Sequence, residues 1–168
     1  MLISEFNQAP LSTIKVFLLH CVHIERWADE ISRHRPFTST EALITFANQQ
    51  AQSWSWDEIL TALNTHPRIG EKNAKQKLSE KEEIFSKKEQ ALISQDQEIL
   101  DEIFRGNLAY EKRFGYIFLI KAFGLSSEEI LTALNYRLVN DPEIEQRIVH
   151  QQLLEIALLR LTQEIQND

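Results

Sequence analysis

The sequence predicts an all-α fold, a single-domain bundle of several helices. Only four glycines and four prolines occur, and they are spread along the chain, as expected for helices joined by short connections. Apolar residues recur at intervals of three and four, which is the spacing of one helix face. The period-two alternation typical of strands is nearly absent. A length of 168 residues, 43% of them hydrophobic, suits one globular domain covering residues 1–168.

The first part of the chain is predicted to form three helices. Pro36 ends the first, since proline does not continue a helix. Thr38 or Ser39 caps the second and Ser55 caps the third, because hydroxyl side chains accept from the free backbone N–H groups of a helix start. The expected ranges are about 12–34, 39–52 and 55–63.

The middle of the chain is less regular. The segment Thr65–Gly70 breaks the helical pattern, and the polar stretch Glu71–Glu83 is interpreted as a solvated lid or surface loop. One long helix is then expected over about residues 85–112, ending near Gly115. The run Tyr116–Phe123 is continuously apolar, and its spacing does not decide whether it is helical.

Two further helix starts are marked near the C-terminal end. Ser126 and Glu129 form a capping-box pattern, and the helix that they open should end near Asn140. Asp141-Pro142-Glu143 combines a cap, a proline at the first helical position and an acidic first turn. These three residues predict a last helix that reaches about Gln166.

The composition argues against several classes of protein. The 18 basic and 25 acidic residues give a net charge of −7, whereas a nucleic-acid binder needs a basic face. The single cysteine, Cys21, has no partner for a disulfide or a zinc ribbon, so we interpret it as a small buried residue in a cytoplasmic protein. Neither a secretory signal nor a membrane-spanning stretch is expected, so no membrane partner is predicted.

Arg160 interrupts an apolar stripe of the last predicted helix. Val149, Leu153 and Ile156 precede it at spacings of four and three, so its side chain should face apolar neighbours. A guanidinium keeps its charge on burial, and such a position needs a carboxylate or an anionic ligand. Alternatively, the stem packs while the charged head reaches solvent. The pattern leaves both interpretations open.

Glu89 interrupts a second stripe, between Phe85 and Leu92, and should also lean toward the core. Ser86 precedes it by one turn and Gln90 follows it. The pattern alone favours a glutamate in the first turn of its helix, stabilised by the helix dipole, over a functional carboxylate.

His66 precedes Pro67, which favours an extended backbone at the exit of a helix. An imidazole on such a turn suits proton transfer near neutral pH, although a lone loop histidine is more often structural or merely exposed. His20 and His23 could share a helical face, but no third ligand accompanies them, so no metal site is expected.

Four motifs follow one another in a specific order. They are His66-Pro67-Arg68-Ile69-Gly70, Ser86-x-x-Glu89-Gln90, Asn107-x-x-Tyr110-x-x-Arg113-Phe114-Gly115-Tyr116-Ile117-Phe118 and Arg137-Leu138-x-Asn140-Asp141. Each is weak alone, and together they are specific. With these motifs, from the first helix to Leu159-Arg160-Leu161, the sequence resembles the 2-oxo-4-hydroxy-4-carboxy-5-ureidoimidazoline (OHCU) decarboxylases.

The resemblance implies a helical enzyme, often a homodimer, that converts its small ureidoimidazoline substrate into (S)-allantoin and CO2 in urate degradation. It implies no cofactor and no metal. His66 corresponds to the catalytic histidine of the family, and Glu89 and Arg160 are expected beside it. The expected substrate contacts are Pro67, Ser86, Gln90, Phe118, Leu119, Ile120, Lys121 and Ala122.

Other interpretations stay open at this point. Arg137 is a second arginine that could face the substrate, although an ion pair with Asp141 is the preferred interpretation. A non-catalytic helical module that binds a partner protein in an apolar groove would not need His66, Glu89 and Arg160 to converge. A relative that acts on a different ureido or α-hydroxy acid would keep the convergence and change the pocket lining.

Overall fold

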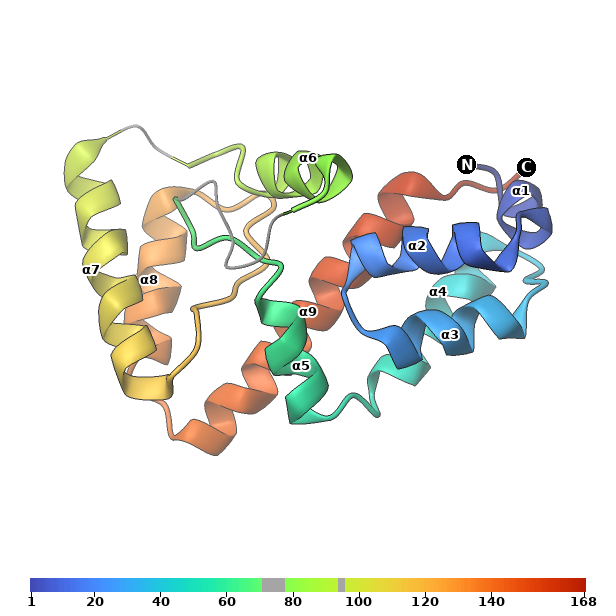
Figure 1. The fold of residues 1–168 in the computed structure, drawn as a ribbon. Coiled ribbons are helices and arrows are strands. Elements are labelled where there is room, and N and C mark those ends of the chain that lie inside the picture. Colours follow the sequence, from blue (N-terminus) through green and yellow to red (C-terminus); the bar gives the residue numbers. More distant parts are fainter. Residues whose placement is uncertain (71–77, 94–95) are drawn as a thin grey trace. The chain divides into compact units, whose positions relative to one another are not determined.

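The computed structural model describes residues 1–70, 78–93 and 96–168, and these ranges form helices joined by loops (Figure 1). No strand occurs within them, and a single isolated bridge pairs Leu2 with Gln166. The all-α prediction is confirmed. In chain order the helices are α1 (Ile3–Gln8), α2 (Leu11–Cys21), α3 (Glu25–His34), α4 (Thr40–Ala51), α5 (Trp56–Leu63), α6 (Glu80–Glu89), α7 (Gln97–Phe114), α8 (Ser127–Arg137) and α9 (Pro142–Glu164).

The contacts among these helices divide the chain into two compact units. Unit 1 comprises Met1–Ala62 and Leu154–Asp168, and unit 2 comprises Leu63–Leu153. Helices α5 and α9 contribute residues to both units. None of the described helices combines the length and the apolar character that a membrane crossing requires.

The helix predicted over residues 12–34 is in fact two helices of unit 1, α2 and α3, which pack against each other. Val22 separates them with an extended backbone, at φ −156° and ψ 133°. Val22 and Ile24 are both buried, so the apolar spacing continues through the break and conceals it. Trp27 of α3 is fully buried and donates from Nε1 to the carbonyl of Ala47 in α4 at 2.9 Å.

Helix α1 is absent from the sequence-based prediction, because six residues are too few to show a helical period. Backbone hydrogen bonds tie it to the other end of the chain. The N–H of Ile3 donates to the carbonyl of Gln166 at 2.8 Å, and the N–H of Gln166 donates to the carbonyl of Met1 at 3.0 Å. Both termini therefore belong to unit 1 and lie side by side (Figure 1).

The predicted helix starts that rest on a serine cap are confirmed. In each case the hydroxyl accepts from the backbone N–H three residues on, at 3.1 or 3.2 Å. The pairs are Ser39–Ala42, Ser55–Glu58 and Ser126–Glu129. Of the two candidates for the second helix, Ser39 is therefore the cap. Pro142 occupies the first position of α9, as predicted.

The long helix predicted over residues 85–112 is also two helices, α6 and α7. Asp96 caps α7, its Oδ1 accepting from the N–H of Glu98 at 2.9 Å. Ser79 caps α6 with a capping box, so residues 80–83 are helical. The prediction of a lid or surface loop over Glu71–Glu83 is therefore wrong for residues 80–83. Residues 71–77 lie outside the described part of the chain. Phe85, Leu92 and Ile99 are spaced by seven, or about two turns, so the period runs through the boundary and hides it.

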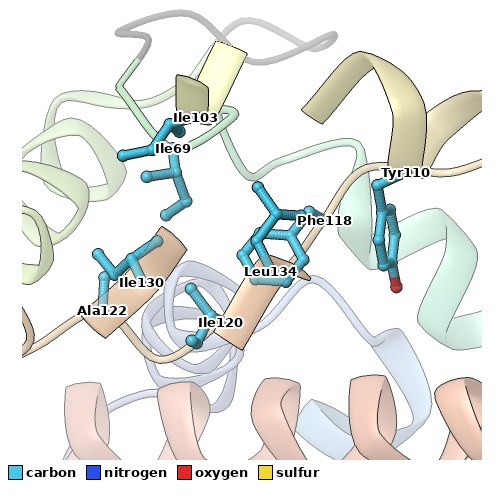
Figure 2. Close-up of a cluster of buried hydrophobic side chains, with 8 residues drawn as sticks. All are labelled: Ile69, Ile103, Tyr110, Phe118, Ile120, Ala122, Ile130 and Leu134. Carbon is cyan, nitrogen blue, oxygen red and sulfur yellow. The ribbon is translucent and has the colours of Figure 1, made fainter. Parts of the chain in front are cut away.

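Helices α7 and α8 pack against each other in unit 2. Their contact needs Gly106, because a Cβ at that position would lie 2.4 Å from Cδ2 of the buried Leu134. Helix α7 ends at Phe114 and is capped by Gly115, whose φ of 84° is left-handed, and residues 117–122 then continue without forming a helix. The apolar core of this unit contains Ile69, Ile103, Tyr110, Phe118, Ile120, Ala122, Ile130 and Leu134 (Figure 2).

A buried ion pair ties α8 to α9 within unit 2. Nε and Nη2 of Arg137 lie 2.8 and 2.7 Å from Oε1 of Glu145, which has no exposed surface. The Tyr110 hydroxyl donates to the same oxygen at 2.6 Å, and Nδ2 of Asn140 donates to Oε2 at 3.1 Å. The expected pairing of Arg137 with Asp141 is therefore wrong. Asp141 is exposed, and Glu145, one turn further along α9, faces inward.

Burial and the hydrogen bond to Glu145 raise the pKa of Tyr110 well above its ordinary value. Its contribution to stability is therefore fully present below the pKa of tyrosine in the unfolded chain, about 10, and is lost as the pH rises beyond it. We expect Tyr110→Phe to lower the free energy of unfolding by about 2 kcal/mol near neutral pH, because the buried carboxylate loses a donor.

The free energies of unfolding of Tyr110→Phe and of the original chain should differ less in strongly alkaline solution. Urea unfolding of both proteins at about pH 8 and about pH 10.5, on either side of the pKa of tyrosine in the unfolded chain, measures this difference. Tyr136→Phe is the matched control, since Tyr136 is 74% exposed. A difference that does not change with pH would contradict the assigned role of Tyr110.

Candidate active site

His66 lies on the loop that follows α5. Its backbone N–H donates to the carbonyl of Leu63 at 3.1 Å, and the residue is only 5% exposed. Pro67 beside it is buried as well. The loop turns back at Gly70, where a φ of 84° is left-handed and suits glycine. The alternative interpretation, that His66 is merely an exposed loop residue, is therefore wrong, because His66 is buried.

Two side chains of α7 hold this loop. Nε and Nη2 of Arg68 donate to the carboxylate of Glu111 at 2.9 and 2.8 Å, which makes a bidentate pair. Nδ2 of Asn107, a residue 3% exposed, donates to the carbonyl of Ile69 at 3.3 Å. Arg68 and Ile69, which follow His66 by two and three residues, are thus attached to a regular helix, which restricts where the imidazole can point.

The end of α6 is joined to the same loop. Gln90, the residue directly after α6, accepts through its Oε1 from the N–H of Gly70 at 3.0 Å. Ser86 and Glu89, on the last turn of α6, are each 8% exposed. The sequence patterns placed Ser86, Glu89 and Gln90 together, and this hydrogen bond brings their turn to the histidine loop.

Glu89 occupies the last position of α6. The interpretation as a glutamate in a first helical turn is therefore wrong, because α6 begins at Glu80 and not near Phe85. The C-terminal end of a helix carries the negative end of its dipole, which disfavours a carboxylate. Glu89 is therefore a buried carboxylate at the end of its helix where the dipole is unfavourable for it.

The run of residues 118–122 is part of the same unit. Phe118, Leu119, Ile120 and Ala122 are buried, and Lys121 is half-buried. Figure 2 shows the side chains of Phe118, Ile120 and Ala122 in one cluster with Ile69 of the histidine loop. The structure therefore brings together three of the predicted segments: the histidine loop, the end of α6 and this run.

Arg160 belongs to unit 1. It is 2% exposed and is among the largest buried side chains, so the alternative in which its head reaches solvent is wrong. Nη1 lies 3.4 Å from the carbonyls of His20 and Cys21. Cys21 itself is fully buried, as expected for a small core residue.

The guanidinium of Arg137 contacts groups of the protein. Besides the ion pair with Glu145, its Nη1 donates to the carbonyl of Leu119 at 2.7 Å, and its Cζ lies 4.5 Å from the centre of the Phe118 ring.

The sequence analysis did not single out Gln152 of α9. Its Oε1 accepts from the N–H of Lys121 at 2.8 Å. The sequence offered one indication that Gln152 faces the core, because it follows the buried Val149 by three residues and so lies on the same side of α9.

The described ranges contain no group of three or more histidine, cysteine, aspartate or glutamate side chains placed to hold a metal ion. His20 and His23 flank the end of α2 without a third such residue in that part of the structure. The side chains expected at the site offer an imidazole, a carboxylate, a hydroxyl, an amide and a guanidinium group.

Known proteins resemble this chain over most of its length. A family model described as OHCU decarboxylase matches residues 7–162. The uric acid degradation bifunctional protein TTL of Arabidopsis thaliana is 30% identical over 142 residues, which are 84% of this chain and 44% of that protein. The chain thus spans less than half of that relative. The 2-oxo-4-hydroxy-4-carboxy-5-ureidoimidazoline decarboxylase of Haloferax volcanii is 26% identical over 143 residues, 84% of this chain and 83% of that protein.

Solved structures agree with these relatives. A crystal structure of OHCU decarboxylase in the presence of (S)-allantoin superimposes with a TM-score of 0.72 and 25% identity, covering 89% of this chain and 96% of that one. A crystal structure of (S)-allantoin synthase has the same TM-score at 19% identity, covers 98% of this chain and 54% of that one, and supports the fold alone. With its family motifs on segments that meet in unit 2 and the family model spanning both units, this chain belongs to the OHCU decarboxylase family.

Proposed function

We propose that this chain decarboxylates 2-oxo-4-hydroxy-4-carboxy-5-ureidoimidazoline to (S)-allantoin and CO2, a step of urate degradation, with His66, Glu89 and Arg160 as its catalytic residues. Membership of the family and the neighbour solved in the presence of (S)-allantoin support the reaction. The observation that carries the residue roles is the hydrogen bond between Gly70 and Gln90, which joins the buried histidine loop to the turn that bears Glu89.

The substrate can delocalise the electrons that decarboxylation leaves behind. Its carboxylate-bearing carbon also holds a hydroxyl and adjoins a ring C=N bond. When the C–CO2 bond breaks, its electron pair forms a C=C bond and the imine electrons move to nitrogen, which takes up a proton. The resulting enol then loses its O–H proton while the neighbouring carbon gains one, and allantoin forms. The substrate therefore carries the electron sink that other decarboxylations obtain from a cofactor.

His66 acts as the base and orienting partner in this scheme. A neutral imidazole can engage the substrate hydroxyl or the carboxylate, and its ordinary pKa suits proton transfer near neutral pH. Burial of His66 supports this role, because proton transfer in a site shielded from bulk water can be directed to one face. Delivery of the proton to one face of the enol sets the S configuration.

Glu89 accepts hydrogen bonds from the ureido or ring N–H groups, and Ser86 and Gln90 complete the orientation of the ring. Ser86, Glu89 and Gln90 lie together at the end of α6, and Ser86 and Glu89 are buried. Pro67 and the run of residues 118–122 supply the remaining contacts, partly through backbone groups. A bound ring held by several fixed groups loses its rotational freedom before the reaction, which lowers the barrier.

Arg160 is proposed to act on the developing charge and not on the departing carboxylate. An arginine bound to that carboxylate would stabilise the ground state that must be lost, and only interactions stronger in the transition state accelerate the reaction. We therefore assign Arg160 to a ring oxygen where charge develops, or to the orientation of Glu89. Its burial supports the assignment, because a fixed charge acts more strongly on developing charge when it is shielded from bulk water.

We also propose that the enzyme is a cytoplasmic homodimer. The single cysteine gives no internal disulfide to form, which suits a reducing compartment. Phe104 and Leu108 lie one turn apart on α7 and are 52% and 51% exposed, and this apolar pair supports an interface with a second copy.

His66→Ala should lower kcat by about a hundred- to ten-thousand-fold, the usual contribution of a general base, because no other imidazole is proposed for proton transfer. The assay generates the unstable substrate in situ and follows (S)-allantoin by circular dichroism, with and without a strong chelator. His23→Ala is the control. No acceleration by the unaltered chain would overturn the function and favour another ureido acid as substrate, whereas full activity of His66→Ala would overturn only the chemistry.

Glu89→Gln should keep the fold and lower kcat/KM by about tenfold or more, since the amide keeps the shape but loses the charged acceptor. Glu83→Gln, an exposed position on the same helix, should leave kcat/KM unchanged. Equal kinetics of the two variants would remove Glu89 from the proposed site.

The oligomer is tested by light scattering during size-exclusion chromatography, where a dimer has twice the chain mass of 19.6 kDa. Phe104→Glu should give monomers, because a charge would be buried in the interface. Val16→Glu, on a residue 53% exposed in unit 1, is the control. A monomeric mass for the unaltered chain at micromolar concentration would contradict the proposal.

A further inference from the structure

We propose that Gln152 of α9 is a positioning residue for the substrate, which it influences through the backbone of residues 118–122. Its Oε1 accepts from the N–H of Lys121 at 2.8 Å. This inference rests on the proposed function, because it assumes that residues 118–122 contact the substrate.

The packing of this run shows that it is extended. Phe118, Ile120 and Ala122 belong to one apolar cluster, and the two residues between them do not (Figure 2). Side chains at every second position on one side are the mark of an extended chain. The backbone N–H and C=O groups of alternate residues then point to the same edge.

Two anchors occupy one edge of the run. Arg137 donates to the carbonyl of Leu119 at 2.7 Å, and Gln152 accepts from the N–H of Lys121, two residues further on. Because 119 and 121 are alternate residues, both anchors lie on the same edge. The backbone groups of Ile120 therefore point to the opposite edge.

That opposite edge carries amides suited to a ligand. Within the described ranges, the N–H groups of Ile120 and Ala122 donate to no protein acceptor, although both residues are buried. Buried backbone N–H groups are nearly always paired in the working state of a protein. An oxygen of the ureidoimidazoline ring is a suitable acceptor, and the two anchors determine where these amides are presented to it.

Gln152 is the anchor that can be altered separately from the core. Arg137 is ion-paired with the fully buried Glu145, so its replacement would leave a buried charge. Gln152 is neutral and half-buried. Its loss would let the run shift along its own direction, and small displacements of substrate-binding groups reduce the rate strongly.

Gln152→Leu should lower kcat/KM by about tenfold, with most of the change in KM, and should reduce the enantiomeric excess of (S)-allantoin. Hydrogen exchange of the peptide that contains residues 118–122 should become faster. Gln152→Glu keeps an acceptor oxygen and should recover most of the lost kcat/KM and of the protection. Gln146→Leu is the control, because Gln146 lies on α9 and its side chain makes no hydrogen bond within the described ranges; it should change neither readout.

The outcomes separate the two proposals. An unaltered chain without activity would overturn the proposed function and this inference with it. An active chain in which Gln152→Leu stays within about twofold of the original kcat/KM would overturn this inference alone. So would a Gln152→Glu variant as impaired as Gln152→Leu. If Gln152→Leu does not fold, Gln152→Met, which keeps the length of the side chain without an acceptor, provides the same comparison.

Discussion

Buried backbone that is not helical must find hydrogen-bond partners outside itself, and this requirement organises unit 2. A helix satisfies its own N–H and C=O groups, whereas residues 65–70 and 117–122 do not. Side chains on or directly after neighbouring helices supply several of the partners: Asn107 for the carbonyl of Ile69, Gln90 for the N–H of Gly70 and Arg137 for the carbonyl of Leu119. The segments proposed to bind the substrate are therefore held by the helices around them.

The buried ion pair explains how one of these partners is kept in place. Arg137 uses two nitrogens on Glu145 and the third on the Leu119 carbonyl. Tyr110 and Asn140 occupy further positions around the same carboxylate, so the charge of Glu145 is well satisfied although it has no exposed surface. Such a pair adds little net stability compared with apolar residues, but it specifies one arrangement of α7, α8, α9 and the run between them.

The proposed catalytic charges differ from this structural pair in their surroundings. Glu89 stands at the unfavourable end of α6, and Arg160 carries its charge at a position that is only 2% exposed. Positions that violate local preference in this way are typical of functional sites, where the compensating interaction includes the ligand. The family motifs, together with the position of Glu89 on its helix, are the basis for proposing Glu89 and Arg160, and not Arg137, as catalytic residues.

The sequence by itself determined the helical class, the serine caps, the start of α9 and the order of the family motifs, because each depends on neighbours within a few residues. It also showed that Glu89 and Arg160 interrupt apolar stripes, and the tertiary structure decided that both are buried. The sequence did not reveal that helices end at Cys21 and Glu89, because the apolar period continues across both ends. Only the tertiary structure decided that Glu145 and not Asp141 pairs with Arg137, and that Gln152 holds Lys121. Those choices depend on which side chains meet across elements distant in the chain, and local spacing carries no information about that meeting.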